Sequence, residues 1–116
     1  MIEIIYDRAN NRVCIHGHAG AGGKGKDVVC AGVSAIAQTL AANVRHWAAT
    51  GRIEGRGETQ LWDGFGDISC IPKPMYEASI KQIMVAICAG FELIANACPE
   101  YVTFRMGEVP EDWPEK

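Results

Sequence analysis

The sequence predicts an α+β fold, with a largely antiparallel sheet of about five strands and two long helices in the order ββαββαβ. Two observations lead to this prediction. Short segments rich in β-branched and apolar residues come in pairs joined by turn residues, and each pair is followed by a long apolar helical pattern. Hairpins that alternate with helices favour a sheet with both helices on one face. A chain of 116 residues suffices for one such domain.

The first half of the chain is expected to form a hairpin and a helix. Residues 2–6 (IEIIY) and 12–17 (RVCIHG) have the composition of strands, and the segment between them supplies turn residues. From residue 27 to about residue 50 an Ala-rich pattern predicts the first helix. Asp27 would be its N-cap, and Gly51 would lie just past its end.

The second half repeats this order and adds a strand. Residues 57–62 and 67–71 predict a second hairpin around a turn at 63–66. Residues 75–97 predict the second helix, and residues 101–106 a final strand. The apolar stripe of the second helix is expected to consist of Tyr76, Ile80, Ile83, Met84, Ile87, Phe91 and Ile94.

The expected domain covers residues 1–107, and residues 108–116, which are rich in acids and prolines, would form a loose C-terminal tail. The first helix is apolar nearly all round, so more than one of its sides must be covered. The sheet covers one side. We expect the second helix or a second subunit to cover another, which favours a homodimer.

The composition excludes several classes of function. A net charge of −3 argues against a direct nucleic-acid partner, which needs clustered Lys and Arg. No membrane segment is expected, because no apolar run approaches the ~20 residues that span a bilayer. The acidic N-terminus does not suit a signal peptide. The five cysteines show neither a CxxC pair nor a zinc-ligand spacing, so we expect a cytoplasmic protein with free thiols and without metal or other cofactor.

Cys30 has surroundings that favour reactivity. With Asp27 as N-cap, Cys30 would lie in the first turn of the helix, where free backbone N–H groups and the helix dipole stabilise an anion. The thiolate is the reactive form of cysteine, and such a position favours it. The other four cysteines suit the role of small buried apolar side chains.

A nucleophilic cysteine also needs a base within hydrogen-bond reach. His46 would lie roughly 24 Å along the helix from Cys30, at ~1.5 Å per residue, and is excluded. Strand alternation places His16 and His18 on the same face, with His18 nearer to the following loop. The residues alone therefore favour His18 only weakly. The residues between His18 and Cys30 are expected to form a flexible glycine loop, with Gly20, Gly22, Gly23 and Gly25, which would let His18 fold back over the helix start.

This loop permits a second interpretation. GAGGKGK matches the opening of a P-loop, after a strand and before a helix. However, Asp27 stands where Ser or Thr would bind magnesium, and its carboxylate would repel phosphates at the helix start. Phosphate or nucleotide binding is therefore the less favoured alternative.

The segment GHA…GKDVVCAGVSAI resembles the signature of the ribosomal-processing cysteine proteases, the Prp family. The residues that carry this resemblance are Gly17, His18, the glycine-rich spacer, Asp27, Cys30 and Ser34. It implies Cys30 as nucleophile, His18 as base and Asp27 as a supporting acid. Ser34, one turn after Cys30, would hydrogen-bond near the site or back to the helix backbone.

The resemblance also implies a reaction. In that family a Cys–His dyad removes a short N-terminal extension from ribosomal protein L27, and related phage proteins trim capsid or scaffold proteins with a similar motif. A homodimer with a mobile loop over the site is implied as well. A non-catalytic, ribosome-associated binding module with an inert Cys30 is the alternative from another class.

Overall fold

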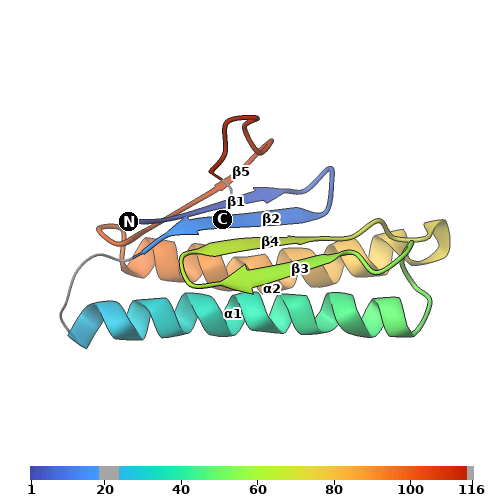
Figure 1. The fold of residues 1–116 in the computed structure, drawn as a ribbon, viewed down its shortest axis with the longest axis horizontal. Helices are drawn as coiled ribbons and strands as arrows, with labels where there is room; N and C mark the ends of the chain where they lie inside the picture. Colours follow the sequence, from blue (N-terminus) through green and yellow to red (C-terminus); the bar gives the residue numbers. More distant parts are fainter. Residues whose placement is uncertain (19–23, 115–116) are drawn as a thin grey trace.

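The structure, a computed structural model, describes residues 1–18 and 24–114. Their order confirms the predicted ββαββαβ arrangement (Figure 1). The elements are β1 (Ile2–Asp7), β2 (Arg12–Gly17), α1 (Lys24–Ala49), β3 (Glu58–Trp62), β4 (Phe65–Ser69), the short 3₁₀ helix η1 (Pro74–Tyr76), α2 (Glu77–Ala97) and β5 (Val102–Met106).

The strands form one five-stranded mixed sheet in the order β3-β4-β2-β1-β5. The hairpin pairs β1–β2 and β3–β4 are antiparallel, as expected, and the pair β2–β4, which joins the two hairpins, is antiparallel as well. β5 pairs with β1 in parallel, because α2 carries the chain back across the sheet before β5 begins. The two hairpins therefore meet through β2 and β4, and the end of β2 comes to lie beside the β3–β4 turn.

Both helices lie against one face of the sheet and run antiparallel to each other (Figure 1). They touch where glycines allow a close approach: a Cβ on Gly32 would lie 3.1 Å from Ile94, and one on Gly90 would lie 3.0 Å from Ile36. The side chains between helices and sheet form the hydrophobic core. Among them are Ile4, Tyr6, Val13, Ile15, Val33, Leu40, Val44, Trp47, Ile68, Ile80, Met84, Cys88 and Phe91.

The middle stretches of both helices carry no charge. No charged residue occurs from Val28 to Val44 or from Gln82 to Phe91, and Leu93 is 70% exposed. By length and composition, the helical segments Val28–Ala49 and Pro74–Ala97 would be able to cross a membrane. This differs from the prediction that the sequence contains no apolar segment of that length. Their polar positions are mostly neutral, and core helices of soluble proteins meet the same criterion, so this is weak evidence.

Two predicted boundaries were wrong. α1 begins at Lys24, about one turn before Asp27, so Asp27 lies within the helix and is not its N-cap. Extending a long helix by a few residues is inexpensive once it is nucleated, and lysine is a good helix former. β4 begins at Phe65, so the turn of the second hairpin consists of Asp63 and Gly64, with Gly64 at φ +78°. Glycine adopts such a conformation without steric cost.

The C-terminal segment, residues 108–114, lies over the sheet face that is turned away from the helices (Figure 1). The indole ring of Trp113 packs edge-on against His16, with 6.2 Å between ring centroids. On this same face, Ile5 and Cys14 are cross-strand partners that are only 2% and 1% exposed. Strand alternation directs both away from the helices, and we infer that the C-terminal segment helps to bury them.

Candidate active site

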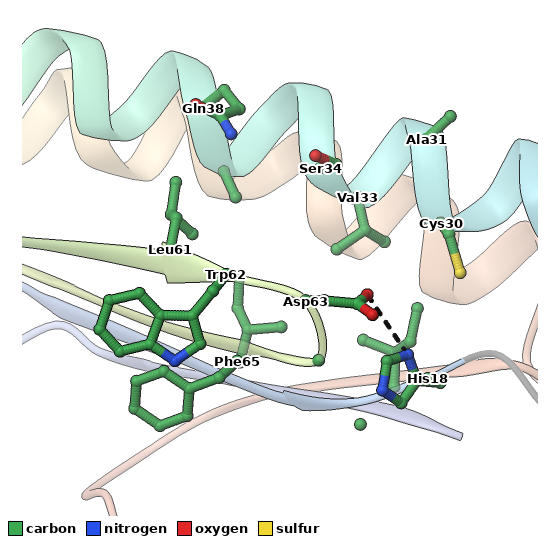
Figure 2. A pocket seen from close by; sticks show the side chains of 15 residues that line it. His18, Cys30, Ala31, Val33, Ser34, Gln38, Leu61, Trp62, Asp63 and Phe65 are labelled. Atoms are coloured by element: carbon green, nitrogen blue, oxygen red, sulfur yellow. Dashed lines mark ion pairs between the residues drawn. The ribbon is translucent and has the colours of Figure 1, made fainter. Parts of the chain in front are cut away.

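A cavity of about 450 Å³ lies between the first half of α1, the end of β2 and the β3–β4 turn (Figure 2). It contains four of the residues predicted for the site: Gly17, His18, Cys30 and Ser34. Apolar residues such as Ile15, Val33 and Leu61 form much of its remaining wall. The fold therefore brings the two ends of the glycine-rich segment to one cavity.

Cys30 lies in the second turn of α1, half-buried against the core, and its sulfur is directed into the gap between helix and sheet (Figure 2). This differs from the predicted first-turn position, because the helix begins earlier. The influence of a helix terminus falls off within the first turn. Activation of the Cys30 thiol would therefore have to come from neighbouring side chains.

His18 is the first residue after β2, and its side chain is 60% exposed at the mouth of the cavity. Its carbonyl oxygen accepts a hydrogen bond from the amino group of Met1. The ring Nδ1 lies 3.7 Å from Oδ1 of Asp63, in the β3–β4 turn. In Figure 2 the Cys30 sulfur is directed from α1 toward the sheet, and the His18 imidazole lies on the sheet side, next to Asp63.

Gly17 connects β2 to His18 in a conformation that requires glycine. Its φ is +103°, and a Cβ there would lie 2.2 Å from the carbonyl oxygen of Met1. Its N–H donates a 2.9 Å hydrogen bond to the carbonyl of Gly64. The turn at Gly17 therefore fixes the strand end against the neighbouring hairpin and aims the next side chain into the cavity.

The other two histidines lie elsewhere. Contrary to strand alternation, His16 and His18 are on different sides of the sheet, because the positive φ of Gly17 reverses the direction of the side chain that follows. His16 contacts Trp113 on the face without helices. His46 is in the last turn of α1 and is exposed. Of the three histidines, the cavity contains His18.

The remaining cysteines match their predicted role as small buried side chains. Burial raises the pKa of Cys14 and of Cys88 to about 12, and that of Cys70 to about 11. Cys98 is half-buried against the core. None of these four lines the cavity.

Some predicted residues are not tested by this geometry. Gly20, Gly22 and Gly23 lie outside the described residues. Gly25, predicted to belong to the loop, is in the first turn of α1. Within residues 1–18 and 24–114 no group of three or more His, Cys, Asp or Glu is placed to hold a metal ion.

Asp63 is the site residue that sequence reasoning missed. The sequence pattern indicates only a turn at Asp63, and its separation from His18 in the chain gives no reason to connect the two residues. A pairing of the two hairpins through β2 and β4 would have been the signal, because it places the end of β2 beside the β3–β4 turn.

A thiol and an imidazole that share one cavity of substrate size form the arrangement that cysteine-dependent hydrolases use. Comparison with known proteins also indicates a cysteine-dependent hydrolase. A family model described as cysteine protease Prp matches residues 1–103. The chain belongs to this family and is a cysteine protease.

Solved structures share the fold. SMU.848 from Streptococcus mutans has 24% sequence identity and a TM-score of 0.63, with 90% of each chain covered. The essential ribosomal processing protease Prp from S. aureus matches in complex with a covalently linked product peptide, with 22% identity, a TM-score of 0.66 and coverage of 92% of this chain and 100% of that one. Its complex with a substrate peptide gives 21% identity, a TM-score of 0.64 and the same coverage. No curated protein matches the chain.

Proposed function

We propose that this protease is an endopeptidase in which Cys30 is the nucleophile and His18 the general base. The observation that carries the proposal is the shared cavity: of the three histidines and five cysteines, His18 and Cys30 line it. Ser34 lies one turn further along α1 in the same wall, where its hydroxyl is available to a bound peptide.

The proposed reaction proceeds in two stages. The imidazole of His18 accepts the proton of the Cys30 thiol, and the thiolate attacks the carbonyl carbon of the scissile peptide bond. The C–N bond then breaks, and His18 returns the proton to the leaving amine. Water, with His18 as base, hydrolyses the thioester and restores the free thiol. Asp27 would support the site from α1, although not as an N-cap.

The substrate we propose is the N-terminal extension of a ribosomal protein L27 precursor, with a phage capsid or scaffold protein carrying a similar motif as the other possibility. The related S. aureus protein is a ribosomal processing protease with substrate and product peptides bound. The apolar wall formed by Ile15, Val33 and Leu61 suits apolar side chains of an extended peptide.

Incubation with the L27 precursor of the same genome, followed by intact mass measurement of the products, tests this function. We expect one cut that releases a short N-terminal peptide. Cys30→Ser and His18→Ala should each slow the reaction at least roughly 1,000-fold with the thermal unfolding curve unchanged. Cys98→Ser, which alters a half-buried thiol outside the cavity, should retain activity. Cleavage by Cys30→Ser would remove Cys30 from the mechanism.

The non-catalytic alternative predicts an inert thiol. Under our proposal, iodoacetamide alkylates Cys30 faster in the native enzyme than in His18→Ala, because the imidazole helps to form the thiolate. Equal alkylation rates in the two proteins, together with an uncut precursor, would favour the binding module.

We also propose that the protease is a cytoplasmic homodimer that pairs through the outer surface of α1 and α2. All five cysteines are free, as expected in a reducing compartment. The charge-free middle stretches of the two helices include the exposed Ile83, and Leu93, which follows Glu92, is also exposed. Leu93→Glu should give a folded monomer by light scattering, whereas Met75→Glu, at an even more exposed position before α2, should stay dimeric. A monomeric parent protein would contradict this.

A further inference from the structure

We propose that the β3–β4 turn positions the catalytic histidine: Asp63 orients the His18 ring and stabilises its protonated form, and Gly64 provides the space for that ring. This inference rests on the proposed role of His18 as the base. It adds a third side chain to the reaction, one that comes from a hairpin remote in sequence from both members of the dyad.

The geometry places the carboxylate at the ring. Oδ1 of Asp63 lies 3.7 Å from Nδ1 of His18, and Figure 2 shows the carboxylate directed toward the imidazole and into the cavity. The backbone keeps the two elements in register, because the N–H of Gly17 donates to the carbonyl of Gly64 at 2.9 Å. The residue before His18 is therefore hydrogen-bonded to the residue after Asp63.

Gly64, the second residue of the β3–β4 turn, leaves space for the His18 ring. A Cβ at this position would lie 2.5 Å from Nε2 and 2.9 Å from Cε1 of His18. The ring thus rests against the turn where a side chain would otherwise stand. With Asp63 at one nitrogen and the Gly64 backbone near the other, the turn limits how the imidazole can rotate.

The contribution of Asp63 belongs to the reaction and not to folding. The carboxylate is 98% exposed and the imidazole 60%, and ion pairs exposed to water contribute little to stability. A peptide that lies in the cavity displaces water from the pair and strengthens the interaction. When the thiol proton of Cys30 moves to His18, the thiolate and the imidazolium form together, and the negative Asp63 stabilises the imidazolium.

The first test is Asp63→Asn, which removes the charge and keeps the size. We expect kcat to fall roughly 10-fold with KM within about twofold, and the rate of Cys30 alkylation near neutral pH to fall as well. Asp63→Glu should recover part of both rates. Glu58→Gln, which neutralises an exposed acid at the far end of β3, should leave both rates unchanged. The thermal midpoint should be the same for all of these proteins.

The second test compares two left-handed glycines. Gly64→Ala and Gly55→Ala introduce similar backbone strain, at φ +78° and φ +58°, but a Cβ on Gly55 meets no atom within 4 Å. We expect both variants to lose similar stability and only Gly64→Ala to lose activity, about 10-fold or more, because its methyl group displaces the His18 ring.

These measurements separate the inference from the function on which it rests. If His18→Ala and Cys30→Ser are inactive while Asp63→Asn and Gly64→Ala behave like the parent, the dyad stands and the role of the turn is refuted. A raised KM with unchanged kcat in Asp63→Asn would also refute it, since Asp63 would then bind substrate directly. If His18→Ala remains active, the proposed function itself fails.

Discussion

Several weak acids of the hydrophobic core are kept in their neutral form. Burial raises the pKa of Tyr6 from 10.0 to about 12, and within residues 1–18 and 24–114 the Tyr6 hydroxyl has no hydrogen-bond partner. The same cause raises the pKa of Cys14 and of Cys88 from 9.0 to about 12, and that of Cys70 from 9.0 to about 11. All four groups therefore favour the folded state as long as they are protonated in both states.

The stability of the protein should therefore decrease in alkaline solution. In the unfolded chain the thiols lose their protons near pH 9.0, whereas the folded protein retains them to about pH 11 or 12. Above pH 9 the unfolded state binds fewer protons, so the free energy of unfolding falls as pH rises. Thermal midpoints by circular dichroism from pH 8 to pH 11 should decrease steadily. A midpoint that rises over this range would contradict the burial of these groups.

The same burial should make thiol reactivity selective. At pH 8 a thiol with a pKa of about 11 is ionised in about one molecule per thousand. Brief alkylation of the native protein, followed by peptide mass mapping, should modify Cys30 and Cys98 and spare Cys14, Cys70 and Cys88. In 6 M guanidinium, used as the control, all five should react. Fast native labelling of Cys88 would mean that the core opens readily.

The sequence was informative about the residues of the proposed dyad but not about their environment. A cysteine near a helix start and a histidine before a glycine-rich segment are visible in the chain, and both reach the cavity. The reason given for Cys30 was wrong, since α1 begins a turn earlier and carries it away from the helix end. Asp63 was not identified, because its contact with His18 arises from strand pairing, which no local pattern encodes.

At the scale of elements, the order of strands and helices was predicted correctly, but the buried face of α2 was predicted less accurately. In α2 the side chain of Cys88 is buried, whereas Ile83, placed in the predicted stripe, is 39% exposed. Helical periodicity alone cannot decide between neighbouring apolar positions when the helix is apolar on most sides. The packing of α2 against both the sheet and α1 determines which of these apolar side chains are buried.

The start of β3 should be sensitive to substitution. Gly57 has φ +67°, and a Cβ there would lie 2.6 Å from the carbonyl oxygen of Ser69 and 2.8 Å from the side chain of Val44. Gly57→Ala should lower the free energy of unfolding by about 1–3 kcal/mol through strain and displacement of the strand pair. Gly55→Ala, with similar φ and open space, should cost less in the same denaturant titration. An equal decrease in the free energy of unfolding for both variants would mean that backbone strain alone causes the loss of stability.

At the scale of the whole molecule, the C-terminal segment extends beyond residues 1–103, the part that matches the family. Residues 108–116 were expected to form a loose tail. Trp113 contacts His16, and residues 108–114 lie over the sheet face where Ile5 and Cys14 are buried.

Removal of residues 108–116 decides how firmly this segment is held. If it covers the sheet, the shortened protein should expose Cys14, which then reacts with a maleimide in the native state at pH 8, and Trp113→Ala should show a smaller effect of the same kind. Trp113 contributes about 0.5–1.5 kcal/mol through its ring contact. If Cys14 reacts no faster after the truncation, the segment is loose as the sequence suggested.

The central claim is that Cys30 forms a covalent bond with the substrate. The most direct measurement is acid quenching of the reaction with the L27 precursor during the first turnover, followed by tandem mass spectrometry of the enzyme. We predict a thioester-linked peptide on Cys30, absent from Cys30→Ser and more abundant when water attack is slowed. An adduct on another cysteine, or continued cleavage by Cys30→Ser, would contradict the account.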